Sequence, residues 1–89
     1  MNKSLNKSLW YFSAGWCGPC KQFGPVMESL AKRGMPIKKI DVDYTPDVVT
    51  RFNVKTIPTV ILVQNDQEVD RFTEARTESQ VINFFNQEK

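Results

Sequence analysis

The chain has 89 residues, of which 40% are apolar and 25% are charged, and its formal net charge is +2. This length leaves room for a single domain, residues 1–89, and the composition excludes an intrinsically disordered protein. No stretch approaches the roughly 18 apolar residues of a membrane span, and the scattered basic residues form no stripe. We therefore expect neither a membrane nor a nucleic-acid partner.

The first half of the chain predicts a strand, a helix and a second strand. Residues 2–9 spell the tetrapeptide NKSL twice, which is too short for a structural repeat and is expected to be a polar lead-in. An apolar run at 9–13 predicts a buried strand. A helical pattern follows over 18–33, with Gly34 as its C-terminal stop, and residues 37–42 predict the next strand. The inward face of this helix is expected to carry Phe23, Val26, Met27 and Leu30.

The second half predicts a short helix, a hairpin and a last helix. A threonine–proline pair that is typical of a helix start precedes a helix expected over 46–52. Strand-type residues at 59–63 and 68–72 flank a polar turn and predict an antiparallel hairpin. The last helix opens with a capping-box pattern at 77–80. Its inward face is expected to carry Val81, Phe84 and Phe85.

The predicted element order, β α β α β β α, places the chain in the α/β class. The first strand, the crossover helix and the second strand form a right-handed parallel unit, whereas the hairpin adds antiparallel strands. We predict a four-stranded mixed sheet in the spatial order 2-1-3-4, flanked by three helices on its two faces.

The only two cysteines, Cys17 and Cys20, lie where the first strand turns into the first helix. Unpaired backbone N–H groups and the helix dipole favour a thiolate at this end of a helix, so Cys17 is the predicted nucleophile. Pro19, between the cysteines, suits the first helical turn. Because one helical turn separates the sulfurs, Cys20 is the predicted resolving thiol, which attacks a mixed disulfide formed on Cys17.

Structural roles for this pair are disfavoured. A disulfide across so short a loop adds little stability, so the pair is expected to react. A structural zinc site usually needs four nitrogen or sulfur ligands, and the chain has two cysteines and no histidine. No metal is expected, and a four-cysteine site shared between two subunits remains the alternative.

The string WCGPCK at residues 16–21 resembles the active-site motif of the thioredoxin family. The resemblance spans residues 8–88 and implies a thioredoxin-like fold without the strand and helix that open full-length members. Pro25 is expected to kink the first helix, as a proline at this offset does in thioredoxins. The resemblance also implies a redox-active Cys17–Cys20 disulfide and no other bound cofactor.

Residues 56–59, with the sequence TIPT, resemble the family loop in which the peptide bond before proline is cis. The resemblance implies that the Ile57–Pro58 loop faces the sulfurs and that the backbone of Ile57 pairs with an extended substrate. Trp16 is expected to flank the site as a contact surface, with a core position as the alternative. The predicted substrate-binding residues are Trp16, Gly18, Pro19, Ile57, Pro58, Glu74 and Ala75.

Tyr11 departs from the family pattern. It stands six residues before Cys17, where thioredoxins usually have a buried aspartate that takes the proton of the resolving thiol. The remaining proton acceptors are water, Lys39 and the Tyr11 hydroxyl, so we expect a slower resolving step near neutral pH. Lys39 matches a family lysine near the resolving cysteine, with a solvated lysine at the strand end as the alternative.

Glu74 is the second departure, because it replaces a glycine that lines the docking groove in thioredoxins. Its carboxylate is expected to narrow the groove, to disfavour the Cys17 thiolate and to repel acidic clients. The alternative is a glutamate that faces solvent and has little effect.

The motifs together predict a thiol–disulfide oxidoreductase that reduces protein disulfides through Cys17 and Cys20. By resemblance, an NADPH-dependent thioredoxin reductase recharges it, and ribonucleotide reductase is an analogous client. We expect a cytoplasmic monomer, because the first apolar run is too short for a secretory signal and a C-x-x-C pair is kept reduced inside cells. Short family members are also familiar from viruses of bacteria, for which the compartment is the host cytoplasm.

Two alternatives to this function remain. The trimmed architecture is similar to that of glutaredoxin, which uses glutathione, although the Gly18–Pro19 pair favours thioredoxin. The other alternative is a non-catalytic subunit of a larger complex, which would bind its partner through the face around Trp16, Ile57 and Ala75.

Overall fold

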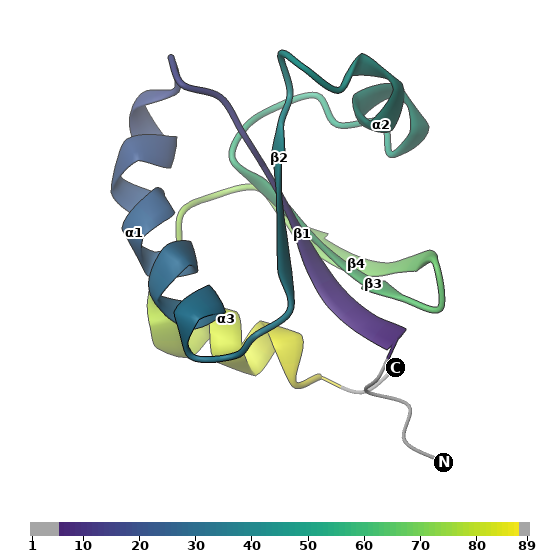
Figure 1. The fold of residues 1–89 in the computed structure, drawn as a ribbon. Helices are drawn as coiled ribbons and strands as arrows, with labels where there is room; N and C mark the ends of the chain where they lie inside the picture. The colour runs from purple at the N-terminus through teal and green to yellow at the C-terminus, as the bar shows by residue number, and fades with distance from the viewer. Residues whose placement is uncertain (1–5, 88–89) are drawn as a thin grey trace.

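The computed structural model describes residues 6–87, which form one sheet with helices on both of its faces (Figure 1). The predicted order of elements is confirmed. The strands are β1 (Lys7–Ser13), β2 (Ile37–Asp41), β3 (Thr59–Gln64) and β4 (Gln67–Phe72), and the helices are α1 (Gly18–Lys32), α2 (Pro46–Arg51) and α3 (Glu78–Phe85).

The strands form a mixed sheet in the order β2-β1-β3-β4, as the sequence predicts. β1 pairs in parallel with β2, so that Leu9 lies opposite Ile37. β1 pairs antiparallel with β3, where Phe12 lies opposite Thr59, and β3 pairs antiparallel with β4. Because β1 and β2 are parallel, their carboxyl ends meet at one edge of the sheet, and the segment that carries the cysteines starts from this edge.

The first strand begins earlier than predicted. Lys7 and Ser8, which were expected to belong to the polar lead-in, extend β1 and pair with Gln64 and Val63. The partner strand explains the difference, because the backbone groups of β3 bind those of β1 whatever side chains β1 carries. The rest of the lead-in, residues 2–5, lies outside the described residues, and the other boundaries agree with prediction to within one residue.

Alternate residues of β1 enter two different cores, one on each face of the sheet. Leu9 and Tyr11 belong to the core that also contains Phe23 of α1 and Val81 of α3. Phe12 packs on the opposite face, in the core next to α2. Figure 1 shows α1 and α3 on one side of the sheet and α2 on the other. Burial on both faces explains why the apolar run of β1 is almost unbroken.

The end of α1 agrees with the sequence. Gly34 has a φ of +104°, a left-handed conformation that glycine adopts without strain, and its N–H donates to the carbonyl oxygen of Ala31 over 3.0 Å. Pro25 lies inside the helix, as predicted. The buried side of α1 carries Phe23, Met27 and Leu30, while Val26 is half-buried.

The last helix is only partly as predicted. Thr77 and Gln80 form the expected capping box at its start. Val81 and Phe84 are buried, but Phe85 is half-buried at the margin of the core. The helical period explains this difference, because Phe85 follows Phe84 by about 100° of rotation and so lies at the side of the buried face.

Candidate active site

The two cysteines are joined as a disulfide at the start of α1. Their Cα atoms are 5.3 Å apart, and both residues are buried. Cys17 is the N-cap residue of α1, and its sulfur accepts a hydrogen bond from the backbone N–H of Cys20 over 3.2 Å. The pair therefore occupies the strand-to-helix position that the sequence predicts, and its sulfurs are bonded across a single helical turn.

The start of α1 stabilises negative charge on the Cys17 sulfur once the disulfide is reduced. The N–H of Cys20 already points at this sulfur, and the helix dipole adds partial positive charge at the same end. Pro19 lies in the first turn and has no N–H to leave unpaired. The first turn of α1 contains no acidic residue. The helix start thus favours a Cys17 thiolate, which is the nucleophilic form.

Trp16 lies on the surface next to the cysteines. Trp16 is 68% exposed, which excludes the alternative that its ring lies in the core. The indole Nε1–H donates to Oδ2 of Asp43 over 2.9 Å, so the ring is held at the surface by the segment that follows β2. Gly18 and Pro19 are also exposed. Exposed residues thus flank both buried cysteines.

The Ile57–Pro58 peptide bond is cis, as the resemblance implies. Ile57 packs against the small buried cluster that contains both cysteines. The loop is held at its start, because the Thr59 hydroxyl donates to the carbonyl oxygen of Thr56 over 2.6 Å. The fold thus brings this loop to the sulfurs from a distant part of the sequence.

A groove of about 350 Å³ lies beside this loop. It brings together Trp16 and Ile57, which the sequence assigns to substrate binding. Three half-buried valines line it, one directly after β2, one from α2 and one from the segment after α2, and the wall is largely apolar. The lining residues are Trp16, Val42, Val49, Val54, Lys55, Thr56 and Ile57.

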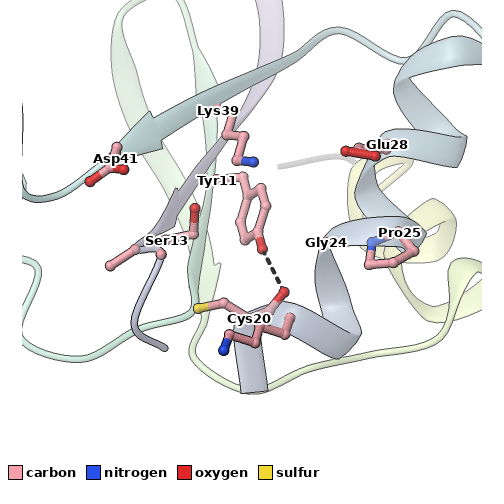
Figure 2. Close-up of a pocket in the computed structure, with 11 residues that line it drawn as sticks. Tyr11, Ser13, Cys20, Gly24, Pro25, Glu28, Lys39 and Asp41 are labelled. Carbon is pink, nitrogen blue, oxygen red and sulfur yellow. Dashed lines mark hydrogen bonds between the residues drawn. The ribbon is translucent and has the colours of Figure 1, made fainter. Parts of the chain in front are cut away.

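A second pocket, of about 310 Å³, lies next to Cys20 and is lined by residues of β1, β2 and α1. Figure 2 shows the Tyr11 ring extending from β1 toward Cys20. The Tyr11 hydroxyl donates to the carbonyl oxygen of Cys20 over 3.5 Å. Lys39 is exposed and lines the same pocket, so the fold brings together Tyr11, Lys39 and Cys20.

Burial raises the pKa of the Tyr11 phenol above its ordinary value of 10.0. A hydrogen bond with the Ser13 side chain lowers this pKa, and the negative charge of Glu28 raises it, but the net direction is upward. The phenol therefore stays protonated near neutral pH. A protonated phenol that donates to a backbone carbonyl is a poor acceptor for the proton of Cys20.

Glu74 and Ala75 lie in the exposed segment between β4 and α3. The Glu74 carboxylate pairs with the Arg76 guanidinium over 2.7 Å, and this hydrogen bond holds the pKa of Glu74 below its ordinary value. The Arg76 guanidinium also lies 4.1 Å from the centre of the Phe72 ring. Because Arg76 compensates the charge of Glu74, the expected repulsion of acidic clients is weakened.

Three carboxylates near the cysteines were not predicted. Glu28 and Asp41 line the pocket next to Cys20, and Asp43 holds the Trp16 indole. Two signals in the sequence point to them. Asp41 and Asp43 come at the end of the second strand, at the sheet edge where the parallel first strand also ends. Glu28 follows Cys20 by about two helical turns, which places both on similar sides of α1.

Within residues 6–87, no helix is long and apolar enough to cross a membrane. The same part of the chain has no group of three or more histidine, cysteine, aspartate or glutamate side chains that could hold a metal ion.

Comparison with known proteins places this geometry in a family. The family model described as Thioredoxin matches residues 1–87. A TPR repeat-containing thioredoxin of Oryza sativa subsp. japonica is 43% identical over 63 residues, which are 68% of this chain and 20% of that protein. Thioredoxin H2 of Arabidopsis thaliana is 40% identical over 77 residues, or 83% of this chain and 58% of that protein. The chain thus spans less than two thirds of the length of either relative.

The fold is shared with solved thioredoxins. The X-ray structure of Fasciola hepatica thioredoxin superposes with a TM-score of 0.81 and 32% sequence identity, over 90% of this chain and 78% of that one. These similarities and the joined Cys17–Cys20 pair support thiol–disulfide oxidoreductase activity. Because the family match extends from residue 1 to residue 87 and the fold is shared, this chain belongs to the thioredoxin family.

Proposed function

We propose that this protein reduces protein disulfides by thiol–disulfide exchange through Cys17 and Cys20. The observation that carries the proposal is the buried disulfide at the start of α1, where the Cys17 sulfur accepts a helix N–H. This environment favours the thiolate that attacks a disulfide, and it leaves the second thiol within bonding distance.

The reaction proceeds in two exchanges. The Cys17 thiolate attacks one sulfur of the client disulfide, the client S–S bond breaks, and one client thiolate leaves. Cys20 then loses its proton and attacks the Cys17 sulfur. The second client sulfur leaves, and the Cys17–Cys20 disulfide forms. Two electrons have then passed from the dithiol of this protein to the client.

An extended segment of the client fits the groove between Trp16 and Ile57. Ile57 lies outside the β1–β3 ladder, whose register extends to Thr59, and this supports the proposal that its backbone pairs with an added strand. Exposed Gly18 and Pro19 extend the contact surface around the sulfurs. Such recognition depends on an accessible backbone more than on particular side chains, which suits a reductant with several clients. Pro58, Glu74 and Ala75 are proposed to complete the docking surface.

A dithiol donor must reduce the disulfide after each cycle, and an NADPH-dependent thioredoxin reductase is proposed for this role. Family membership supports protein disulfides and thioredoxin reductase as partners in general. Ribonucleotide reductase is proposed as one client by analogy. A cytoplasmic location is proposed because a reducing compartment returns the pair to its dithiol form. The protein is also proposed to act as a monomer. No cofactor other than the disulfide is needed for either exchange.

Reduction of insulin disulfides, with thioredoxin reductase and NADPH as the donor system, tests the proposal. The wild-type protein is expected to turn over. Cys17→Ser is expected to be inactive because the nucleophile is lost, and Cys20→Ser is expected to trap a mixed disulfide with the client. Glutathione with its own reductase is assayed in parallel. Turnover with glutathione alone would indicate a glutaredoxin, and no turnover in either system would favour a binding subunit; both outcomes contradict the proposal.

A further inference from the structure

The pocket next to Cys20 is the candidate route for the proton that the resolving thiol loses. Cys20 is only 5% exposed, but it lines this pocket, which has a volume of about 310 Å³. Charged and polar side chains face the pocket from every element around it. They are Tyr11 and Ser13 of β1, Lys39 and Asp41 of β2, and Lys21 and Glu28 of α1.

Most of these groups are poor proton acceptors. The Tyr11 phenol is protonated and already donates to the Cys20 carbonyl oxygen. The Lys21 and Lys39 ammonium groups have donors only. Asp41 takes part in the turn after β2, because its Oδ1 accepts the N–H of Asp43 over 2.9 Å. Of the two carboxylates in the pocket, Glu28 is the one whose oxygens accept no hydrogen bond within the described residues.

Glu28 is available for proton transfer. Within the described part of the chain, no hydrogen bond or ion pair involves its carboxylate. Its charge acts on the Tyr11 hydroxyl, which in turn contacts Cys20. Figure 2 shows the Glu28 side chain extending from α1 toward Tyr11 and Lys39. The carboxylate therefore faces the same pocket as Cys20 and is exposed to solvent.

Pro25 makes the wall of this pocket suitable for bound water. Proline has no N–H, so the carbonyl oxygen of Lys21 has no helical hydrogen-bond donor four residues later. Lys21 and Pro25 both line the pocket. The hydroxyl-bearing residues Tyr11 and Ser13 and the carboxylate-bearing Glu28 line the same pocket, and an ordered water requires two to four polar partners of this kind.

We propose that Glu28 is the terminal acceptor for the proton of Cys20, reached through water in this pocket. The inference rests on the exchange reaction proposed above. In the second exchange the S–H bond of Cys20 breaks, and its electron pair forms the new S–S bond to Cys17. The bond between Cys17 and the client sulfur breaks, and the client leaves as a thiolate. The proton passes through water to the Glu28 carboxylate and then to solvent, so no further oxidant or reductant is required.

Stopped-flow reaction of the reduced protein with an aromatic disulfide whose thiolate product is coloured separates the two exchanges. Attack by Cys17 releases one thiolate, and resolution by Cys20 releases the second. In Glu28→Gln the first phase is expected to be unchanged. The second is expected to slow by roughly tenfold near neutral pH, which is less than the roughly 10²–10⁴-fold effect of a direct general base because water intervenes. Added acetate is expected to restore part of the rate.

Whether the second phase becomes slower or faster in Glu28→Gln distinguishes proton transfer to Glu28 from an effect of its negative charge alone. If Glu28 acted only through its negative charge, removal of that charge would stabilise the Cys20 thiolate and speed the second phase. Asp66→Asn is the matched control, because it removes the same charge from the β3–β4 turn. Asparagine tolerates the φ of +65° at that position. This control is expected to change neither phase.

Several results would overturn the inference. These are an unchanged or faster second phase in Glu28→Gln, equal slowing of both phases, or equal slowing in Asp66→Asn. The small disulfide needs no protein client, so normal two-phase kinetics without insulin reduction would refute the proposed function and leave the role of Glu28 intact.

Discussion

Tyr11 places an uncharged phenol at the buried position next to Cys20. The residue is 2% exposed, and its hydroxyl donates to the Cys20 carbonyl oxygen. A neutral buried donor with a partner costs little free energy, whereas a buried carboxylate without a partner is costly. The resolving thiol thus has a stable neutral neighbour on the side of the sheet and releases its proton toward the open pocket.

Tyr11→Asp is expected to speed the second exchange by roughly tenfold near neutral pH, because it places a base beside Cys20. It is also expected to lower the free energy of unfolding, because a carboxylate is buried. Stopped-flow resolution and urea unfolding measure the two effects. Tyr11→Asn is the control, since it removes the ring without adding a base. An unchanged rate of resolution by Cys20 in Tyr11→Asp would contradict the expectation that tyrosine in place of the family aspartate slows this step.

The raised pKa of Tyr11 predicts a loss of stability in alkali. A phenol whose pKa is higher in the folded than in the unfolded state stabilises the fold below pH ~10, and this contribution is lost as pH rises through the folded-state pKa. Tyr11→Phe is expected to be somewhat less stable at neutral pH, because the hydroxyl contact is lost, but to depend less on pH in alkali. Urea unfolding of both proteins from pH ~8 to ~11 measures this difference. Parallel curves would show that Tyr11 does not titrate as inferred.

At the scale of elements, α1 and α3 begin with N-cap residues of different chemistry. α1 begins with Cys17, whose sulfur accepts the N–H that a serine or aspartate accepts in an ordinary cap. α3 begins with Thr77, whose Oγ1 accepts the N–H of Gln80 over 3.2 Å, while the Gln80 side chain accepts the N–H of Thr77. The first cap is the proposed nucleophile, whereas the second stabilises the start of its helix.

Thr77→Ala is expected to lower the free energy of unfolding by about 1 kcal/mol, because the N-cap acceptor is lost. Thr77 is exposed, so little packing changes. Ser79→Ala is the control in the same turn: Ser79 is exposed, and alanine is the better helix former there. Chemical unfolding monitored by circular dichroism compares the two. A loss in Ser79→Ala as large as that in Thr77→Ala would argue against the capping contribution.

At the scale of the whole molecule, the sheet separates two hydrophobic cores, one covered by the helices α1 and α3 and the other next to the short helix α2. Leu62 and Tyr11 face the core with α1 and α3, whereas Ile61 and Phe12 face the core next to the six-residue helix α2. Arg71 of β4 reinforces the second side, because its Nη2 donates to the carbonyl oxygen of Phe52 over 2.7 Å. The short helix is thereby tied to the hairpin across the edge of this core.

Leu62→Ala is expected to lower the free energy of unfolding by about 2–5 kcal/mol, because Leu62 is fully buried and its loss leaves a cavity. Ile61→Val, at the neighbouring buried position on the other face, is expected to lower it by only about 0.5–1.5 kcal/mol. Urea unfolding measures both. Equal losses for the two variants would mean that the cavity argument does not hold at Leu62.

Local sequence determined most of the framework and the reactive pair of this protein. The apolar run of β1, Pro46 at the start of α2, the capping box of α3 and Gly34 each act over a few neighbouring residues, which is why element order and boundaries were predictable. Thr45 does not cap α2 through its side chain, because its hydroxyl donates to the carbonyl oxygen of Asp41 instead. Cys17 and Cys20 were predictable for the same reason, since one helical turn relates them. The extension of β1 through Lys7 was missed, because it depends on pairing with Gln64 in a distant strand.

Tertiary structure decided what surrounds the sulfurs. The cis bond before Pro58 could be expected only from family resemblance, since a trans bond is the usual local preference. The Trp16–Asp43 hydrogen bond and the pocket in which Tyr11 and Lys39 meet Cys20 depend on side chains from segments that are distant in the sequence. The physical reason is range: backbone preferences act between near neighbours, whereas burial and electrostatic interactions act through space and are set only when the chain has folded.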